Sequence, residues 1–172
     1  MDGTNTKTAL PFRGDYIRYT NLLFTNLKFW QKIVGEKVLI FQLDSIFCSN
    51  TPHKIEDYVQ YDYIGAPWRA SLKTPVPVGN GGFSFRSKIK TIKLLEKIQY
   101  DESTPEDVWY GVNLPLVNGT VAPPEIAKTF SVETLYYEKP MALHKLSLRK
   151  ADIKKLCDKC PEAMYIPPFC KK

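Results

Sequence analysis

Asp44 is the first residue of this chain whose surroundings suggest chemistry. It follows Val38 to Phe41, four consecutive apolar residues rich in β-branched and aromatic types. This run predicts a strand buried on both faces and central in a sheet. Ligands of open α/β sheets bind beyond the carboxyl ends of the strands, so Asp44 is placed to hold a metal ion or a sugar. The alternative is that its side chain caps the turn that follows the strand.

The glycine-rich stretch from Gly79 to Arg86 is a second candidate for ligand binding. Three glycines within four residues allow the backbone to approach a ligand closely and to adopt positive φ. Phe83 and Phe85 then restore the alternation of a strand. Asn80-Gly81 is also a common signal for a plain hairpin turn, and that alternative stays open.

Two of the four cysteines, Cys157 and Cys160, have the spacing of zinc ligands. A closed zinc site needs four ligands, so Cys170 together with His144 or Cys48 would have to complete it. The cysteines lack the dense pattern of a small secreted domain, because Cys48 stands alone. We therefore expect reduced thiols and a cytoplasmic protein.

Length and charge limit the classes of function. A chain of 172 residues with 44% hydrophobic content predicts one globular domain. The formal charge of +6 favours anionic partners, among them nucleotide diphosphates, nucleic acid and acidic surfaces. No apolar run approaches the ~20 residues of a membrane span, and the first ten residues do not resemble a secretory signal.

Much of the positive charge lies between Arg86 and Lys97. Ile89, Ile92 and Leu95 recur there at three-residue steps, which predicts an amphipathic helix whose lysines form the solvated side. Nucleic-acid binding would need base-stacking aromatic side chains on that same face. The sequence offers none there, so a nucleic-acid partner is not expected.

The remaining elements follow from periodicity and from capping residues. Asp15 is expected to cap a helix from Tyr16 to about Ile33, which Gly35 ends. Pro105 begins another helix, with Glu106 and Asp107 in its first turn, where both acids also suit the helix dipole. The other expected elements are a helical turn at 55–61, a short strand at 62–68, strands at 130–137 and 141–144, and a last helix from Ser147 to about Cys160.

Several of these segments resemble a family of largely uncharacterised glycosyltransferase-like domains. The resemblance rests on Lys37 to Ser45, Tyr61 to Trp68, Gly79 to Arg86, Pro105 to Asp107, and Leu143-His144, and it runs from about Tyr16 to Cys160. More distantly, the series is similar to inverting enzymes of the GT-A fold, which move a sugar from a nucleotide diphosphate to a hydroxyl group. The resemblance implies an α/β fold, namely a truncated GT-A-like (Rossmann-like) mixed sheet flanked by helices. The resemblance assigns residues 14–160 to a glycosyltransferase-like domain. The short polar stretch 1–13, broken by Pro11, predicts a mobile arm, and the proline-rich stretch 161–172 predicts an irregular tail.

The resemblance also implies a divalent metal, Mn²⁺ or Mg²⁺. Such a cation would neutralise the leaving nucleoside diphosphate. Asp44 takes the place of the last acid of the family's Asp-x-Asp motif, and His144 matches a position that supplies a further metal contact. Gln42 stands where the first acid would be, so one carboxylate is absent.

The same resemblance assigns the other site residues. Asp107 matches the general base, which takes the proton from the attacking hydroxyl, and Glu106 beside it would bind the donor sugar or the acceptor. The substrate-binding residues implied are Gln42, Asp62, Trp68, Asn80, Gly81, Gly82 and Ser84. Among them, Gly81 and Gly82 would lie against the sugar, and Trp68 would form a stacking wall.

Only one predicted helix precedes the Asp44 strand, whereas GT-A enzymes begin with a nucleotide-binding strand-helix-strand half. The nucleoside pocket is therefore expected to be largely missing. Either a second subunit supplies that half, or the chain is a degenerate copy that binds a carbohydrate or a nucleotide sugar without catalysis.

Overall fold

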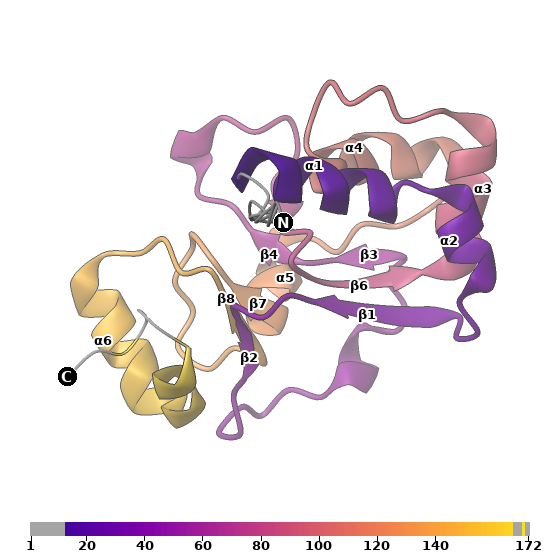
Figure 1. Ribbon diagram of the computed structural model, residues 1–172. Coiled ribbons are helices and arrows are strands. Elements are labelled where there is room, and N and C mark those ends of the chain that lie inside the picture. The colour runs from indigo at the N-terminus through magenta and orange to yellow at the C-terminus, as the bar shows by residue number, and fades with distance from the viewer. Residues whose placement is uncertain (1–12, 167–169, 171–172) are drawn as a thin grey trace, which may run out of the picture.

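Three small β-sheets and the helices around them form the part of the chain that the computed structural model describes, residues 13–166 and 170 (Figure 1). This arrangement is a mixed α/β fold, as the sequence predicts. Residues 1–12 of the expected arm lie outside the described residues. Arg13, its last residue, is the first residue of helix α1 (Arg13–Phe24). None of the helices in the described ranges is long and apolar enough to cross a bilayer.

The first sheet contains β1 (Lys37–Phe41), β6 (Phe83–Ser87) and β3 (Tyr63–Ile64), in the order β1-β6-β3. Both pairings are antiparallel. The prediction that the Val38 strand is central and buried on both faces is wrong, because β1 lies at the edge and β6 in the middle. Ile40 is buried, but Phe41 is 65% exposed where β1 leaves the sheet.

The second sheet contains β2 (Ser45–Phe47), β8 (Ala142–His144) and β7 (Ser131–Val132), in the order β2-β8-β7. Strand β8 is antiparallel to β2 and parallel to β7. The expected strand at 130–137 is reduced to β7. Helix α5 (Pro124–Phe130) ends where that strand was expected to begin, so the alternating residues beyond Val132 continue without strand pairing.

A third sheet pairs β4 (Ala66–Pro67) with β5 (Val78–Gly79). Because β5 pairs with β4 while β6 pairs with β1 and β3, the glycine-rich stretch is a connection between sheets and not a plain hairpin. The strand predicted from Phe83 and Phe85 is confirmed as β6. Gly65 lies between β3 and β4. A side chain does not fit there, because a Cβ atom would lie 1.7 Å from the carbonyl oxygen of Gly79.

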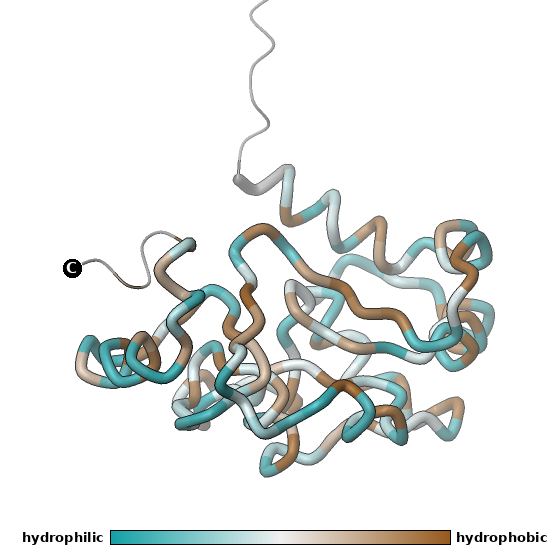
Figure 2. The backbone as a smooth tube through the Cα atoms, turned by 90° about the horizontal axis from the view of Figure 1, so that it is seen from below, coloured by the Kyte–Doolittle hydropathy of each residue, from teal (hydrophilic) through white to brown (hydrophobic). Residues whose placement is uncertain are grey.

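The expected helix from Tyr16 to Ile33 is instead two helices, α1 (Arg13–Phe24) and α2 (Leu27–Lys32). Asn26 causes the break, because its side chain accepts a hydrogen bond from the amide of Phe29 and so caps α2. The indole N–H of Trp30 donates to the carbonyl oxygen of Phe24, which fixes the end of α1. Asp15 lies within α1 and is not its cap. Figure 2 shows that apolar and polar residues alternate along α1.

Helix α3 (Lys88–Lys97) confirms the predicted amphipathic helix, but its lysines are not simply solvated. Lys90 donates to the carbonyl oxygens of Val117 and Asn118, and Lys97 donates to that of Leu116. These three acceptors lie at the end of the short helix η3 (Leu114–Val117). Two of the basic residues therefore bind backbone carbonyls on the neighbouring element.

The remaining helices are α4 (Glu106–Asn113), α6 (Lys150–Lys159), and the short helices η1 (Ile55–Tyr58), η2 (Ala70–Leu72) and η4 (Pro161–Tyr165). Helix α6 begins at Lys150, so Ser147 is not its cap. Because η4 occupies 161–165, the expected irregular tail is helical in its first part.

Apolar side chains gather in three clusters. One surrounds Phe83 and Phe130 beneath the first sheet. A second surrounds Leu143 and Leu156 between the second sheet and α6. A third surrounds Tyr63 and Trp109, between the first sheet and α4. The first cluster also contains Ala142 of β8, so its packing joins the first two sheets.

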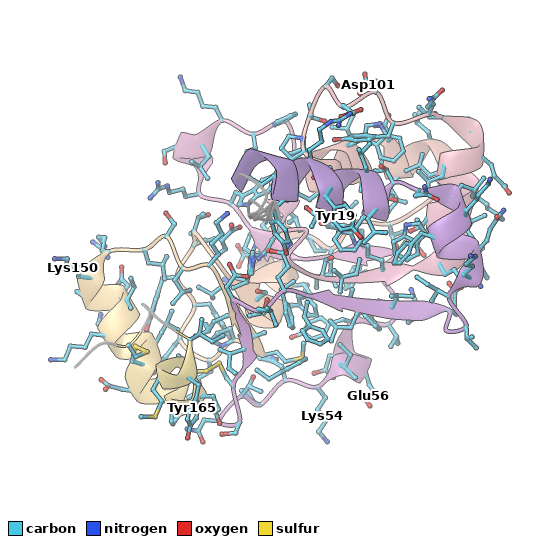
Figure 3. The ribbon with its side chains drawn as sticks, viewed as in Figure 1. Tyr19, Lys54, Glu56, Asp101, Lys150 and Tyr165 are labelled. Atoms are coloured by element: carbon cyan, nitrogen blue, oxygen red, sulfur yellow. A yellow bond between two sulfur atoms is a disulfide. The ribbon has the colours of Figure 1, made fainter. Side chains whose placement is uncertain are left out.

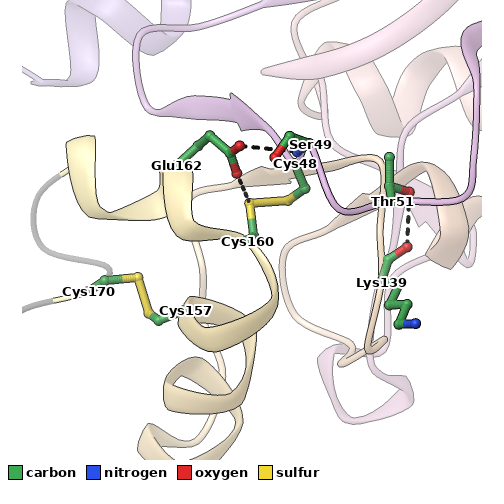
Figure 4. The surroundings of a disulfide bond; sticks show 8 residues. All are labelled: Cys48, Ser49, Thr51, Lys139, Cys157, Cys160, Glu162 and Cys170. Carbon is green, nitrogen blue, oxygen red and sulfur yellow. Dashed lines mark hydrogen bonds between the residues drawn. A yellow bond between two sulfur atoms is a disulfide. The ribbon is translucent and has the colours of Figure 1, made fainter.

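The four cysteines form two disulfides, Cys48–Cys160 and Cys157–Cys170 (Figure 4). This corrects the expectation of reduced thiols and removes these sulfurs from any zinc site. Cys48 and Cys160 are 112 residues apart in sequence. They meet because β2 lies against η4, where Glu162 also accepts a hydrogen bond from the amide of Ser49.

Candidate functional site

Strand ends from the first two sheets meet at a cleft of about 360 Å³. Gln42 follows β1, Gly82 precedes β6, and His144 ends β8. Most of the predicted site residues line this cleft: Gln42, Asp44, Asn80, Gly81, Gly82, Glu106, Asp107 and His144. A smaller hollow of about 240 Å³ at the end of α3 holds none of the predicted site residues.

Glu106 is fully engaged by Arg86. The two side chains are buried, and both carboxylate oxygens accept hydrogen bonds from the guanidinium, at 2.7 and 2.9 Å. Burial raises the pKa of Glu106, and the charge of Arg86 opposes that rise. Burial alone would lower the pKa of Arg86, but the Glu106 carboxylate raises it. This ion pair engages both oxygens of a side chain that is only 3% exposed, so we assign Glu106 a positioning role.

Ser84 is buried beneath the same pair. Its hydroxyl accepts a hydrogen bond from Nε of Arg86 at 2.9 Å and donates to the carbonyl oxygen of Gly81 at 3.4 Å. The structure therefore does not support Ser84 as a ligand donor. The guanidinium of Arg86 also lies 5.0 Å from the ring centres of Tyr63 and Tyr110, so this one cation ties α4 to β6 and β3.

Asp107 shapes the glycine-rich loop. Its Oδ2 accepts hydrogen bonds from the amides of Asn80 and Gly81 at 2.9 and 3.0 Å, and its Oδ1 accepts from the amide of Val108. Asn80 adopts a positive φ of 73°, and its Oδ1 accepts from the amide of Phe83. Nδ2 of Asn80 is buried without a partner among the described residues, at the wall of the cleft.

Gly81 and Gly82 of the glycine-rich loop leave room for protein side chains. A Cβ atom on Gly81 would lie 1.9 Å from Oε1 of Glu106, and one on Gly82 would lie 2.3 Å from Nε2 of His144. The expected reason for these glycines was close approach to a sugar. The geometry gives a different reason, namely that a carboxylate and an imidazole already occupy the space.

Asp44, His144 and Gln42 converge in the part of the cleft next to Gly82. Nε2 of His144 lies 3.2 Å from Oδ1 of Asp44 and 3.3 Å from Oε1 of Gln42. Burial lowers the pKa of His144, and the charge of Asp44 opposes that shift. The carboxylate and amide oxygens suit Mn²⁺ or Mg²⁺, the imidazole would add one nitrogen ligand, and substrate phosphates would be further ligands. The described residues include no group of three or more His, Cys, Asp or Glu side chains with metal-site geometry.

Glu133 and Lys145 line the cleft but were not identified from the sequence. Glu133 directly follows β7, and its Oε2 accepts a hydrogen bond from the indole N–H of Trp68 at 2.9 Å. Burial raises the pKa of Glu133 to about 7. No sequence motif marks Glu133. The parallel pairing of β7 with β8 brings it to the same edge as His144.

Trp68 and Asp62 lie outside the cleft. The ring of Trp68 packs on Gly79, where a Cβ atom would lie 2.1 Å from it, so Trp68 supports the wall from behind. Asp62 lies near the far end of the first sheet, where its carboxylate accepts a hydrogen bond from the amide of Thr120 at 2.9 Å. Neither residue is positioned to contact a ligand in the cleft.

Helix α1 forms the remaining wall with Tyr16, Ile17, Thr20, Asn21 and Phe24. Oδ1 of Asn21 accepts a hydrogen bond from the amide of Glu106 at 3.3 Å, which joins this wall to the start of α4. Tyr19, labelled on α1 in Figure 3, is 62% exposed. The sequence predicted this helix without a role in the site, whereas the structure makes it a wall of the cleft.

Replacing Gly82 with alanine is expected to destabilise the protein by about 1–3 kcal/mol, since the new methyl group overlaps the His144 ring. Urea denaturation measures the change. Gly35→Ala is the matched control, because its Cβ atom would meet nothing closer than 3.5 Å. Equal stability of the two variants would contradict the crowding at His144.

The fold and cleft define an α/β protein with an acidic, amide-lined site at the ends of its strands. The chain belongs to the family described as Protein of unknown function (DUF5672), whose model matches residues 8–144. The match includes every predicted site residue and ends before Cys157, Cys160 and Cys170. No curated protein and no solved structure matches the chain.

Proposed function

We propose that this protein transfers a sugar from a nucleotide-diphosphate sugar to a hydroxyl acceptor, with inversion, on a truncated GT-A-like fold. The observation that carries the proposal is the convergence of Asp44, His144 and Gln42 within 3.3 Å at the cleft that also holds Asp107. Three separate segments deliver these residues to one edge of the sheets. Such an edge is where α/β proteins bind nucleotides and sugars.

The charge of the cleft supports a cation-dependent donor. Asp44, Asp107 and Glu133 line it without an arginine partner among the described residues, and Lys145 is the basic side chain beside them. A diphosphate entering such a site is repelled unless a cation accompanies it. Asp44 and His144, with Gln42, would hold a Mn²⁺ or Mg²⁺ ion, which when bound neutralises the leaving diphosphate.

The remaining polar groups suit sugar hydroxyls. Carboxylate oxygens of the cleft accept hydrogen bonds from hydroxyl groups, and the unpartnered Nδ2 of Asn80 donates one. The volume of about 360 Å³ is at the lower end of the ~300–1,000 Å³ typical of ligand sites. The sugar and phosphate end of a donor is the part that matches this volume. A second polypeptide would then supply the contacts to the nucleoside.

A panel of nucleotide-diphosphate sugars, tested for binding with and without Mn²⁺ and then for turnover, checks the proposal. We expect Mn²⁺-dependent binding of at least one donor, with about tenfold or greater weakening in Asp44→Asn. Asp158→Asn, an exposed site on α6, is the matched control and should bind as the wild type does. Binding that ignores Mn²⁺ and Asp44, or no binding at all, would contradict the proposal.

A non-catalytic carbohydrate or nucleotide-sugar binder is the second candidate. Gln42 favours it, because an amide replaces the first carboxylate of the motif and binds a cation more weakly. This candidate predicts donor binding without turnover under any divalent metal. The panel above separates the two functions.

The cytoplasmic location stays a prediction. It was inferred partly from reduced cysteines, and the two disulfides remove that support. Disulfides persist mainly in oxidising compartments. Measuring the free thiols of the protein isolated from its native source would decide which redox state it keeps.

A further inference from the structure

We infer that Glu133 takes the proton from the acceptor hydroxyl, and that Asp107 positions the glycine-rich loop. The inference rests on the proposed function, since it names the base for that transfer. It departs from the assignment by resemblance, which gives the base to Asp107. The contacts of the two carboxylates separate their roles.

The carboxylate of Asp107 is engaged by the backbone at both of its oxygens. Three backbone amides donate to its two oxygens, and two of those amides belong to the loop at Asn80 and Gly81. Protonating the carboxylate would weaken the hydrogen bonds that hold this loop against the cleft. Asp107 therefore acts through the loop geometry.

Glu133 has one oxygen fixed and one available. Its Oε2 accepts from the indole of Trp68, and Trp68 is itself held by packing on Gly79. Its Oε1 has no hydrogen bond from the other described residues, and the side chain lines the cleft. A carboxylate held at one oxygen and open at the other is arranged to accept a proton.

The surroundings of Glu133 suit proton transfer near neutral pH. Burial raises the pKa of Glu133 to about 7. Trp68 lowers this pKa by its hydrogen bond, Asp107 and Asp44 raise it, and Lys145 lowers it from the end of β8. A base is most effective when its pKa lies near the working pH.

In the transfer step, the acceptor oxygen forms a bond to the anomeric carbon of the sugar while the bond from that carbon to the phosphate oxygen breaks. The bonding electron pair leaves with the nucleoside diphosphate. The hydroxyl proton goes to Oε1 of Glu133, which releases it to solvent after the product departs.

Glu133→Gln and Asp107→Asn, assayed for donor binding and turnover, test the inference. The amide introduced by Glu133→Gln keeps an oxygen that accepts the Trp68 hydrogen bond but cannot take a proton. This variant should therefore bind donor normally and lose about 10²–10⁴-fold in kcat. Asp107→Asn should weaken donor binding and keep a higher kcat than Glu133→Gln. Glu125→Gln, on the exposed face of α5, is the matched control and should keep full activity.

The pH dependence gives a readout that a structural role would not move. The base must be deprotonated, so the wild-type kcat/KM, which reports the free enzyme, should rise with pH through about 7, the pKa of Glu133. The indole N–H resonance of Trp68 should titrate over the same range and be flat in Glu133→Gln. Full turnover by Glu133→Gln would overturn the inference and leave the proposed function intact. Absence of donor binding and turnover in the wild type would overturn both.

Discussion

Replacing Arg86 with methionine is expected to lower the free energy of unfolding by about 3–5 kcal/mol. The substitution leaves the buried Glu106 carboxylate without the guanidinium that donates to both its oxygens. It also removes a cation that lies 5.0 Å from the ring centres of both Tyr63 and Tyr110. Denaturant unfolding measures the change, which is large beside the ~5–15 kcal/mol that stabilises a typical domain.

Two further variants isolate the effect of the buried charge. The double variant Arg86→Met with Glu106→Leu should recover much of the loss, because no unpaired charge remains buried. Arg18→Met removes an exposed pair with Glu102 and should cost only about 0.2–1 kcal/mol. Equal losses at Arg18 and Arg86, or a double variant weaker than Arg86→Met, would contradict the importance of the buried charge.

Acid should partly rescue the Arg86→Met variant. Burial raises the pKa of Glu106 in the folded state even with Arg86 present, and without that cation the rise is larger. A carboxyl group with a higher pKa in the folded state binds protons more readily there, so folding gains stability as the pH falls. The deficit of the variant should therefore be smaller in mildly acidic solution than at neutral pH.

Removal of the Cys48–Cys160 disulfide should cost about 4–5 kcal/mol of stability, on the chain-entropy model. The bond joins positions 112 residues apart, so its loss frees nearly two thirds of the unfolded chain from a constraint. The double variant Cys48→Ala with Cys160→Ala isolates this effect. Urea unfolding of that variant against the wild type measures it.

The second disulfide provides the matched control. Cys157 and Cys170 are 13 residues apart, so the corresponding double alanine variant should lose about 3 kcal/mol or less. The longer bond also lies close to the strand that carries His144. The amide of Cys48 donates to the carbonyl oxygen of Met141, just before β8. A larger loss from the short bond than from the long one would contradict the chain-entropy account.

Local sequence signals predicted the elements that local chemistry determines. The helix that starts beside Glu106, the strand at 141–144 and the turn at 55–61 are present as α4, β8 and η1. Glycine spacing and phenylalanine alternation likewise located the loop and β6. In each case the signal, whether a capping residue, a periodicity or a glycine, lies within a few residues of the element that it predicts.

The errors concern partners distant in sequence. The apolar run of β1 cannot reveal whether a strand lies on one side or on both, so its edge position was missed. The pairing of Cys48 with Cys160 depends on β2 meeting η4, which no local pattern encodes. Asn26 was overlooked as a cap because the apolar stripe continues past it.

The site was predicted as a set of residues better than as a set of roles. The family resemblance named Asp44, Asp107 and His144 as site residues, and all three line one cleft, but it did not indicate that Arg86 would pair with Glu106. Glu133 carries no motif, and its importance depends on the parallel pairing of β7 with β8. Roles depend on which partner reaches each oxygen, and that information lies in the tertiary structure.

The edge position of β1 has a practical consequence for handling the protein. Within residues 13–166, β1 pairs with β6 alone, so one row of its backbone groups faces away from the sheet, next to the exposed ring of Phe41. An open edge of this kind is a template on which another polypeptide can add a strand. Self-association at this edge would narrow access to Gln42 and Asp44, which follow directly on β1. Dilution series therefore belong in every titration of this protein.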